Sequence, residues 1–220
     1  MEFLSGAVDL FLNLDEHLNT VVQNYGIWTY GILTLVIFLE TGIVATPFLP
    51  GDSLLFAAGA IASLGSINII LLVVLLAIAA ILGDTVNYWI GRKAGPLVFS
   101  KENSLFFNKN YLRRAYDFYE KHGAKTVVIA RFIPIIRTFA PFVAGIGHMS
   151  YAKFAAYNIA GGILWVAAFS LAGYFFGNIP VIKENFGLGI VGIIIVSLIP
   201  TVVEFIKHRR KPASISENKL

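Results

Sequence analysis

Residues 130–145 read ARFIPIIRTFAPFVAG, and they place two arginines and two prolines in a run that is otherwise typical of a membrane-embedded segment. An arginine side chain cannot neutralise itself by losing its proton. At the centre of a membrane helix each arginine raises the free energy of insertion by roughly 2.5–3.5 kcal/mol, whereas each surrounding Val, Ile or Phe lowers it by only about 0.3–0.6 kcal/mol. We therefore expect Arg131 and Arg137 to face a polar cavity, a carboxylate or an anionic ligand inside the protein.

The composition is that of a polytopic membrane protein. The 220 residues are 57% hydrophobic and only 14% charged, and several apolar runs reach the roughly 20 residues that cross a bilayer. The chain has no cysteine and four scattered histidines, so the sequence predicts no metal site and no cofactor. Its net charge of +4 comes largely from basic loop and tail segments and is no sign of nucleic-acid binding.

The N-terminal residues 1–24 carry apolar side chains at helical spacing, with acidic and polar side chains on the other side. This pattern predicts an amphipathic helix that lies along the membrane surface. Its acidic face is unusual for such a helix, because interfacial helices mostly carry Lys and Arg. Packing of the same helix on the rest of the protein is the alternative.

Four full spans and two shorter pieces are predicted in a single membrane domain, residues 25–206. The spans cover residues 27–46, 67–90, 154–177 and 186–206. The shorter pieces lie near residues 47–64 and 126–147. The apolar part of the first piece, residues 54–64, reaches only about 16 Å at about 1.5 Å per residue, half of the hydrocarbon core. We expect this piece to enter and leave the membrane on the same side.

The basic residues predict the orientation of the chain. Most of the 17 Lys and Arg lie in the loop of residues 92–125 or in the tail of residues 207–220, which is typical of cytoplasmic segments. Because only two full spans separate this loop from the tail, residues 126–147 must also return to the side from which they came. The sequence thus predicts an all-α protein with four transmembrane helices, two re-entrant hairpins and both termini in the cytoplasm.

The two halves of the chain look alike. The hairpins end in Ala58-Gly59 and in Ala144-Gly145, and the span after each hairpin ends in Tyr-x-x-Gly. One hairpin enters from outside and the other from the cytoplasm. This arrangement is the inverted repeat of many secondary transporters, whose binding site lies near the middle of the membrane.

The two hairpins also carry complementary charges. Glu40 and Asp52 flank the first hairpin, and Arg131 and Arg137 belong to the second. The short helices that follow the prolines, the second of them after Pro141, are expected to point their N-termini into the protein, where free N–H groups favour anions. The sequence therefore predicts a site for an anionic headgroup between the arginines, next to carboxyl groups that can exchange protons.

Several motifs extend this interpretation over nearly the whole chain: FLETG (38–42), PFLPGD (47–52), GDTVNY (83–88), GR (91–92), FYEKHG (118–123) and RFIPIIR (131–137). In this combination they resemble the bacterial DedA family of inner-membrane proteins, which is similar to the eukaryotic VTT-domain lipid scramblases. The resemblance implies a flippase or transporter that moves a lipid across the inner membrane, driven by the proton-motive force, in support of membrane and envelope homeostasis. Undecaprenyl phosphate is the leading substrate, and another anionic phospholipid is the alternative.

The resemblance also implies roles for particular residues. The functional acids of the family fall on Glu40 and Asp52, and its functional arginines fall on Arg131 and Arg137. We assign Arg131, Arg137 and Asp52 to substrate binding, and Glu40 and Asp52 to proton coupling. Asp84 and Asn87, toward the end of their span, are secondary candidates.

Other interpretations of these residues stay open. The arginines could be purely structural partners of the carboxylates, and Asp52 could be only the N-cap of the following short helix. The large aromatic residues are expected to be interface or packing residues: Trp28, Tyr88, Trp89 and Trp165.

Two further functions compete with transport, and the oligomeric state is left open. A membrane lipid phosphatase could use His148 with the arginine pair, but no second histidine lies in the membrane segments, so we expect no enzyme and no catalytic residue. A non-transporting assembly or structural factor would use the same charges only as internal ion pairs.

Overall fold

The computed structural model describes residues 14–43, 51–65, 67–98, 109–180 and 182. Within these residues every regular element is a helix, which confirms the predicted all-α class. The α-helices are α2 (Leu14–Gly42), α3 (Gly51–Ala62), α4 (Ile69–Val98), α5 (Lys109–His122), α6 (Thr126–Ile129), α7 (Pro134–Ile146) and α8 (Tyr151–Gly177). Two short 3-10 helices, η1 (Gly123–Lys125) and η2 (Ala130–Phe132), flank α6.

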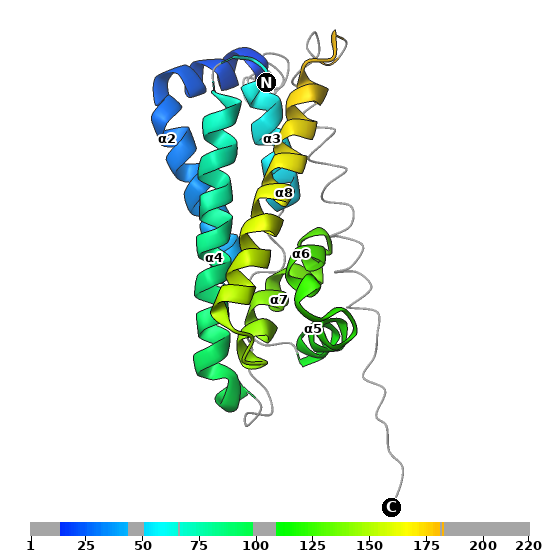
Figure 1. Cartoon of the computed structure of the whole chain (residues 1–220). Helices are drawn as coiled ribbons and strands as arrows, with labels where there is room; N and C mark the ends of the chain where they lie inside the picture. Colours follow the sequence, from blue (N-terminus) through cyan, green and yellow to red (C-terminus); the bar gives the residue numbers. More distant parts are fainter. Residues whose placement is uncertain (1–13, 44–50, 66, 99–108, 181, 183–220) are drawn as a thin grey trace, which may run out of the picture.

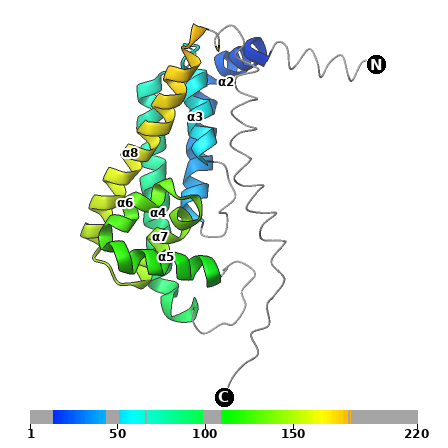
Figure 2. The same cartoon turned by 90° about the vertical axis from the view of Figure 1, so that its right-hand side faces the viewer.

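Three long helices, α2, α4 and α8, form the frame of the molecule. In Figures 1 and 2, α3 lies beside the upper half of this frame, and α5, α6 and α7 lie beside its lower half. The contacts agree with this view, because α3 packs mainly on α8, whereas α7 packs mainly on α4. Each short helix thus rests on the long helix from the other half of the chain.

Two helices in the described part of the chain are long and apolar enough to cross a membrane, over Ile69–Lys93 in α4 and over Tyr151–Gly177 in α8. Their outward side chains are apolar: Ile70 is 73% exposed and Phe175 is 67% exposed. Soluble proteins rarely expose apolar surface of this extent, so the surface is suited to lipid. The predicted span of residues 186–206 and the basic tail lie outside the described residues.

Helix α2 differs from the predicted boundaries. It runs without a break from Leu14 to Gly42, so its backbone hydrogen bonding continues through residue 24, the predicted end of the interfacial helix. Its first part lies across the top of the molecule in Figure 1 and the rest descends along α4. No proline interrupts residues 14–42, which explains why the backbone hydrogen bonding continues. The apolar part is Gly26–Gly42, and residues 44–46 of the predicted span lie outside the described residues.

The segment predicted as a polar loop, residues 92–125, is largely helical. Helix α4 continues past the predicted end of its span to Val98, and α5 covers most of the described remainder, residues 109–125, and packs on α7. Gly91 does not end α4. It instead allows close packing, because a Cβ at Gly91 would collide with the carbonyl oxygen of Phe142 in α7.

Glycines also set the contact between α3 and α8. A Cβ at Gly59 would collide with the carbonyl oxygen of Ser170, and one at Gly173 would collide with the carbonyl oxygen of Phe56. The two backbones therefore touch directly, in the manner of helices that pack in membranes through small residues.

We expect Gly59→Ala to lower the free energy of unfolding by about 1–3 kcal/mol, because the added methyl group overpacks a backbone contact. Gly31→Ala is the matched control, since a Cβ at Gly31 meets no atom within 4 Å and alanine favours a helix over glycine by up to about 1 kcal/mol. Thermal unfolding in detergent measures both variants. Equal melting temperatures for the two would contradict the proposed close contact of α3 with α8.

Candidate functional site

Both arginines of the opening segment are buried and paired with carboxylates from the first half of the chain. Arg131 lies in η2 and Arg137 lies one turn into α7; they are 2% and 6% exposed. Their partners come from α2, α3 and α4. The structure therefore brings the predicted acids and arginines together inside the protein, as expected for guanidinium groups that cannot lose their charge.

Arg137 is held by two carboxylates at once. Its Nη2 donates to Glu40 Oε1 at 2.7 Å, and its Nη1 donates to Asp52 Oδ1 at 2.5 Å. Trp165 Nε1 donates to the same Asp52 oxygen at 2.8 Å, and the Trp165 ring lies 4.9 Å from the guanidinium carbon of Arg137. The Glu40 side chain is buried, whereas the Asp52 side chain is 31% exposed to solvent.

The local sequence explains this arrangement. Asp52 lies in the first turn of α3, where the positive end of the helix dipole favours a carboxylate. The preceding Gly51 leaves room for the other acid, because a Cβ at Gly51 would collide with the carboxylate of Glu40. Asp52 thus lies within the first turn of α3 and pairs with Arg137. The alternative prediction, that Asp52 only caps the N-terminus of this helix, does not account for the ion pair.

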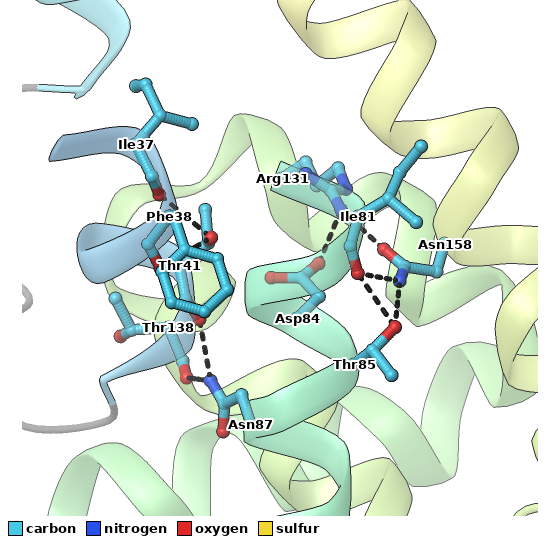
Figure 3. A network of polar contacts seen from close by, with 10 residues as sticks. All are labelled: Ile37, Phe38, Thr41, Ile81, Asp84, Thr85, Asn87, Arg131, Thr138 and Asn158. Carbon is cyan, nitrogen blue, oxygen red and sulfur yellow. Dashed lines mark hydrogen bonds and ion pairs between the residues drawn. The ribbon is translucent and has the colours of Figure 1, made fainter. Parts of the chain in front are cut away.

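Arg131 pairs with the secondary candidate Asp84, as Figure 3 shows. Its Nη2 donates to Asp84 Oδ2 at 2.5 Å and to Asn158 Oδ1 at 2.6 Å. Asn158 in turn donates through Nδ2 to the carbonyl oxygen of Ile81 at 3.0 Å. Asp84 was expected near the end of its span, but α4 extends to Val98, so Asp84 lies in the middle of the helix and is buried.

Room for Arg131 comes from Gly161 of α8. A Cβ at Gly161 would lie 3.1 Å from Arg131 Cδ and 3.2 Å from Nε, whereas a Cβ at Gly162 would crowd Ile81, at 2.9 Å. Within the described residues, Nε and Nη1 of Arg131 are buried without a hydrogen-bond partner. A buried donor left without a partner is costly, so these two groups can gain from a ligand or a rearrangement.

One prediction about the second hairpin is wrong. Helix α7 begins at Pro134 and continues through Pro141 to Ile146, so no helix N-terminus follows Pro141. The break comes earlier, at Ile133, whose backbone is extended with φ −119° and ψ 103°. A residue before proline avoids the helical region, which explains a break at Ile133 ahead of Pro134.

Sequence reasoning missed two residues of this site. Trp165 was expected to be an interface or packing aromatic, yet it is fully buried, bonds Asp52 and lies within 4.9 and 5.9 Å of the guanidinium carbons of Arg137 and Arg131. Asn158 was not singled out. Both carried a signal. Trp165 lies in the middle of an apolar span, far from the interfaces that tryptophan usually occupies, and Asn158 is a polar residue within the same span.

Asn87, the other secondary candidate, is fully buried and bonds backbone rather than a charged group. Its Nδ2 donates to the carbonyl oxygens of Thr41 and Thr138. His148 lies at an exposed turn with a positive φ of 53°, and no group of three metal-binding side chains is found among the residues that the structure describes.

Comparison with known proteins finds the family described as VTT domain over residues 49–175. The chain is 56% identical to Protein DedA of Escherichia coli strain K12, with 97% of this chain and 98% of that protein covered. It is 46% identical to an uncharacterized membrane protein of Mycobacterium leprae, with 77% and 76% covered. It is 36% identical to the inner membrane protein YqjA of Escherichia coli strain K12, with 69% of each covered. No solved structure matches the chain.

We expect Arg131→Met to lower the free energy of unfolding by about 3–5 kcal/mol, because it leaves the carboxylate of Asp84 buried without its cation. The double variant Arg131→Met with Asp84→Leu should recover most of this loss, since apolar replacement of both partners removes the unpaired charge. Thermal unfolding in detergent compares the variants. A double variant no more stable than the single one would show that the two groups are not coupled.

Proposed function

The chain belongs to the DedA family of VTT-domain membrane proteins, and from this premise we propose that it carries an anionic lipid across the bacterial inner membrane, driven by the proton-motive force. Undecaprenyl phosphate is the leading substrate, and another anionic phospholipid is the alternative. The single observation that carries this proposal is Arg137, buried between the carboxylates of Glu40 and Asp52. A guanidinium held by two carboxylates is suited to exchange one of them for a phosphate of similar geometry.

The charge balance of the site supports proton coupling. Arg131 and Arg137 face three carboxylates, from Glu40, Asp52 and Asp84. With every group ionised the cluster holds one negative charge more than it holds positive charges, so the uptake of one proton balances it. Burial of an unbalanced charge is costly, which favours coupling between the proton and the occupant of the site.

We propose the following sequence of events. A proton on Glu40 or Asp52 weakens the hold of that carboxyl on Arg137, and an anionic headgroup then accepts the freed hydrogen bonds. Asp52 is the group to leave first, because it is the partly exposed partner. Nε and Nη1 of Arg131, which have no hydrogen-bond partner among the described residues, supply further donors for the headgroup.

The arrangement of the short helices supports alternating access. Helices α3 and α7 have 12 and 13 residues, so at about 1.5 Å per residue each reaches about 20 Å and is too short to cross the hydrocarbon core. They lie at opposite ends of the long helices in Figure 2. We propose that they belong to two re-entrant hairpins, related by an inverted repeat, within four full spans whose loop and tail face the cytoplasm.

The non-transporting structural factor is the second candidate, because each arginine already has a carboxylate partner within the protein. A purely structural ion pair tolerates reversal of its two charges better than a carrier does. Because Glu40 pairs with Arg137, the test is the double variant Glu40→Arg with Arg137→Glu. Recovery of function in this double variant would favour the structural role.

In vesicles reconstituted with the pure protein, we expect Arg137→Ala and Glu40→Gln to slow the flipping of undecaprenyl phosphate by about 10–100-fold. The reason is that a hydrogen bond to a charged group contributes roughly 1.5–3 kcal/mol. A headgroup-accessibility assay measures the rate, and Lys153→Ala, which removes an exposed cation of α8, is the control. Rates equal to wild type in both site variants would remove these residues from the mechanism.

We propose that the protein is not an enzyme, and His148 offers the test. Its amide donates to the carbonyl oxygen of Gly145, and the next amide, of Met149, donates to that of Ala144, so His148 occupies the left-handed position that follows many helices. We expect His148→Gly to raise the melting temperature slightly and to leave lipid flipping unchanged, because glycine adopts a positive φ without strain. Release of inorganic phosphate from lipid by the wild type, lost in this variant, would instead support a phosphatase.

A further inference from the structure

We propose that Asn87 is the positioning residue of the transport site. It holds the end of α2 against α7 so that Glu40 and Arg137 face each other. This inference rests on the proposed function for its link to transport. The geometric part can be measured without any lipid substrate.

The side chain of Asn87 joins two helices to which it does not belong. Asn87 lies on α4 and is fully buried. Its Nδ2 donates to the carbonyl oxygen of Thr41 in α2 at 3.2 Å and to that of Thr138 in α7 at 2.9 Å (Figure 3). One amide nitrogen therefore lies between two helix backbones and bridges them.

The two carbonyl groups are those next to the ion pair. Thr41 directly follows Glu40 and Thr138 directly follows Arg137, and these two charged side chains meet at 2.7 Å. A shift of either backbone at the bridge would move the neighbouring charged residue with it. The bridge thus determines the separation from which Glu40 and Arg137 reach each other.

Thr41 needs an outside donor at this position. Helix α2 ends at Gly42, and the last carbonyl groups of a helix have no partner within it. The hydroxyl of Thr41 donates to the carbonyl oxygen of Ile37 at 2.9 Å. Gly83 lets α4 approach closely, because a Cβ at Gly83 would collide with Thr41 Oγ1. That approach brings Asn87, one turn further along α4, within reach of the Thr41 carbonyl.

Asparagine has the chemistry that this position needs. Its amide nitrogen carries two hydrogens, so it can donate to two carbonyl oxygens at once. A carboxylate would place oxygen against oxygen, a leucine of similar size would donate to neither, and a serine hydroxyl has a single hydrogen. The residue type therefore matches the two acceptors.

The test measures the distance between α2 and η2, the short helix that leads into α7. The chain has no cysteine, so spin labels can be placed only at Leu39→Cys in α2 and Phe132→Cys in η2, which precedes α7. These side chains are 40% and 44% exposed. Pulsed electron–electron resonance in vesicles then gives the distance distribution, and the unlabelled proteins give the rate of lipid flipping.

We expect Asn87→Leu to broaden this distribution and to slow flipping about tenfold or more, because buried carbonyl groups lose their donor. The control is Leu72→Ala, which removes a buried apolar side chain from α4 far from the bridge. It should lower the melting temperature while keeping the distribution narrow and the rate close to wild type. If Asn87→Leu does not fold, Asn87→Ser replaces it, and its single donor should give the same broadening.

A narrow, unshifted distribution in the Asn87 variants would overturn the proposal, whatever their rate. A broad distribution with a wild-type rate would also overturn it, because the bridge would then have no bearing on transport. A wild-type protein that flips no anionic lipid would instead refute the proposed function. In that case the distances alone would still decide whether Asn87 sets the geometry of the ion pair.

Discussion

The permanent charge of two buried guanidinium groups is the constraint on which the structure depends. Neither Arg131 nor Arg137 can lose a proton to avoid the free-energy cost of burying its charge. Each therefore needs a carboxylate in the protein interior. The three carboxylates come from α2, α3 and α4, which all precede the arginines in the chain. The ion pairs therefore require the two halves of the chain to fold against each other.

Close backbone contact makes these long-range pairs geometrically accessible. Glycines let α3 touch α8 and let α7 touch α4 without intervening side chains. Glycines also make room for the charged side chains, because Gly51 leaves space for Glu40 and Gly161 leaves space for Arg131. Small residues at helix contacts are common in membranes, and here they also determine where charged side chains can be buried.

The two arginines differ in a way that suits a carrier. Arg131 is buried, with Asp84 and Asn158 as partners, and it ties η2 to α4 and α8. Arg137 shares two carboxylates, one of them partly exposed, and the ring of Trp165 lies near both guanidinium groups. One ion pair can thus keep the fold together while the other exchanges partners, a division of roles that a single buried pair could not support.

The sequence by itself determined the class of the protein, the short apolar piece of residues 54–64, and the need to pair two arginines inside the protein, because hydropathy, length and charge are local properties. It did not determine which acid meets which arginine: Glu40 faces Arg137, and Asp84, not Glu40, faces Arg131. It also misplaced the start of α7 and overlooked Trp165 and Asn158. These features depend on how distant helices pack, and only the tertiary structure brings residues so far apart in the chain within hydrogen-bonding distance.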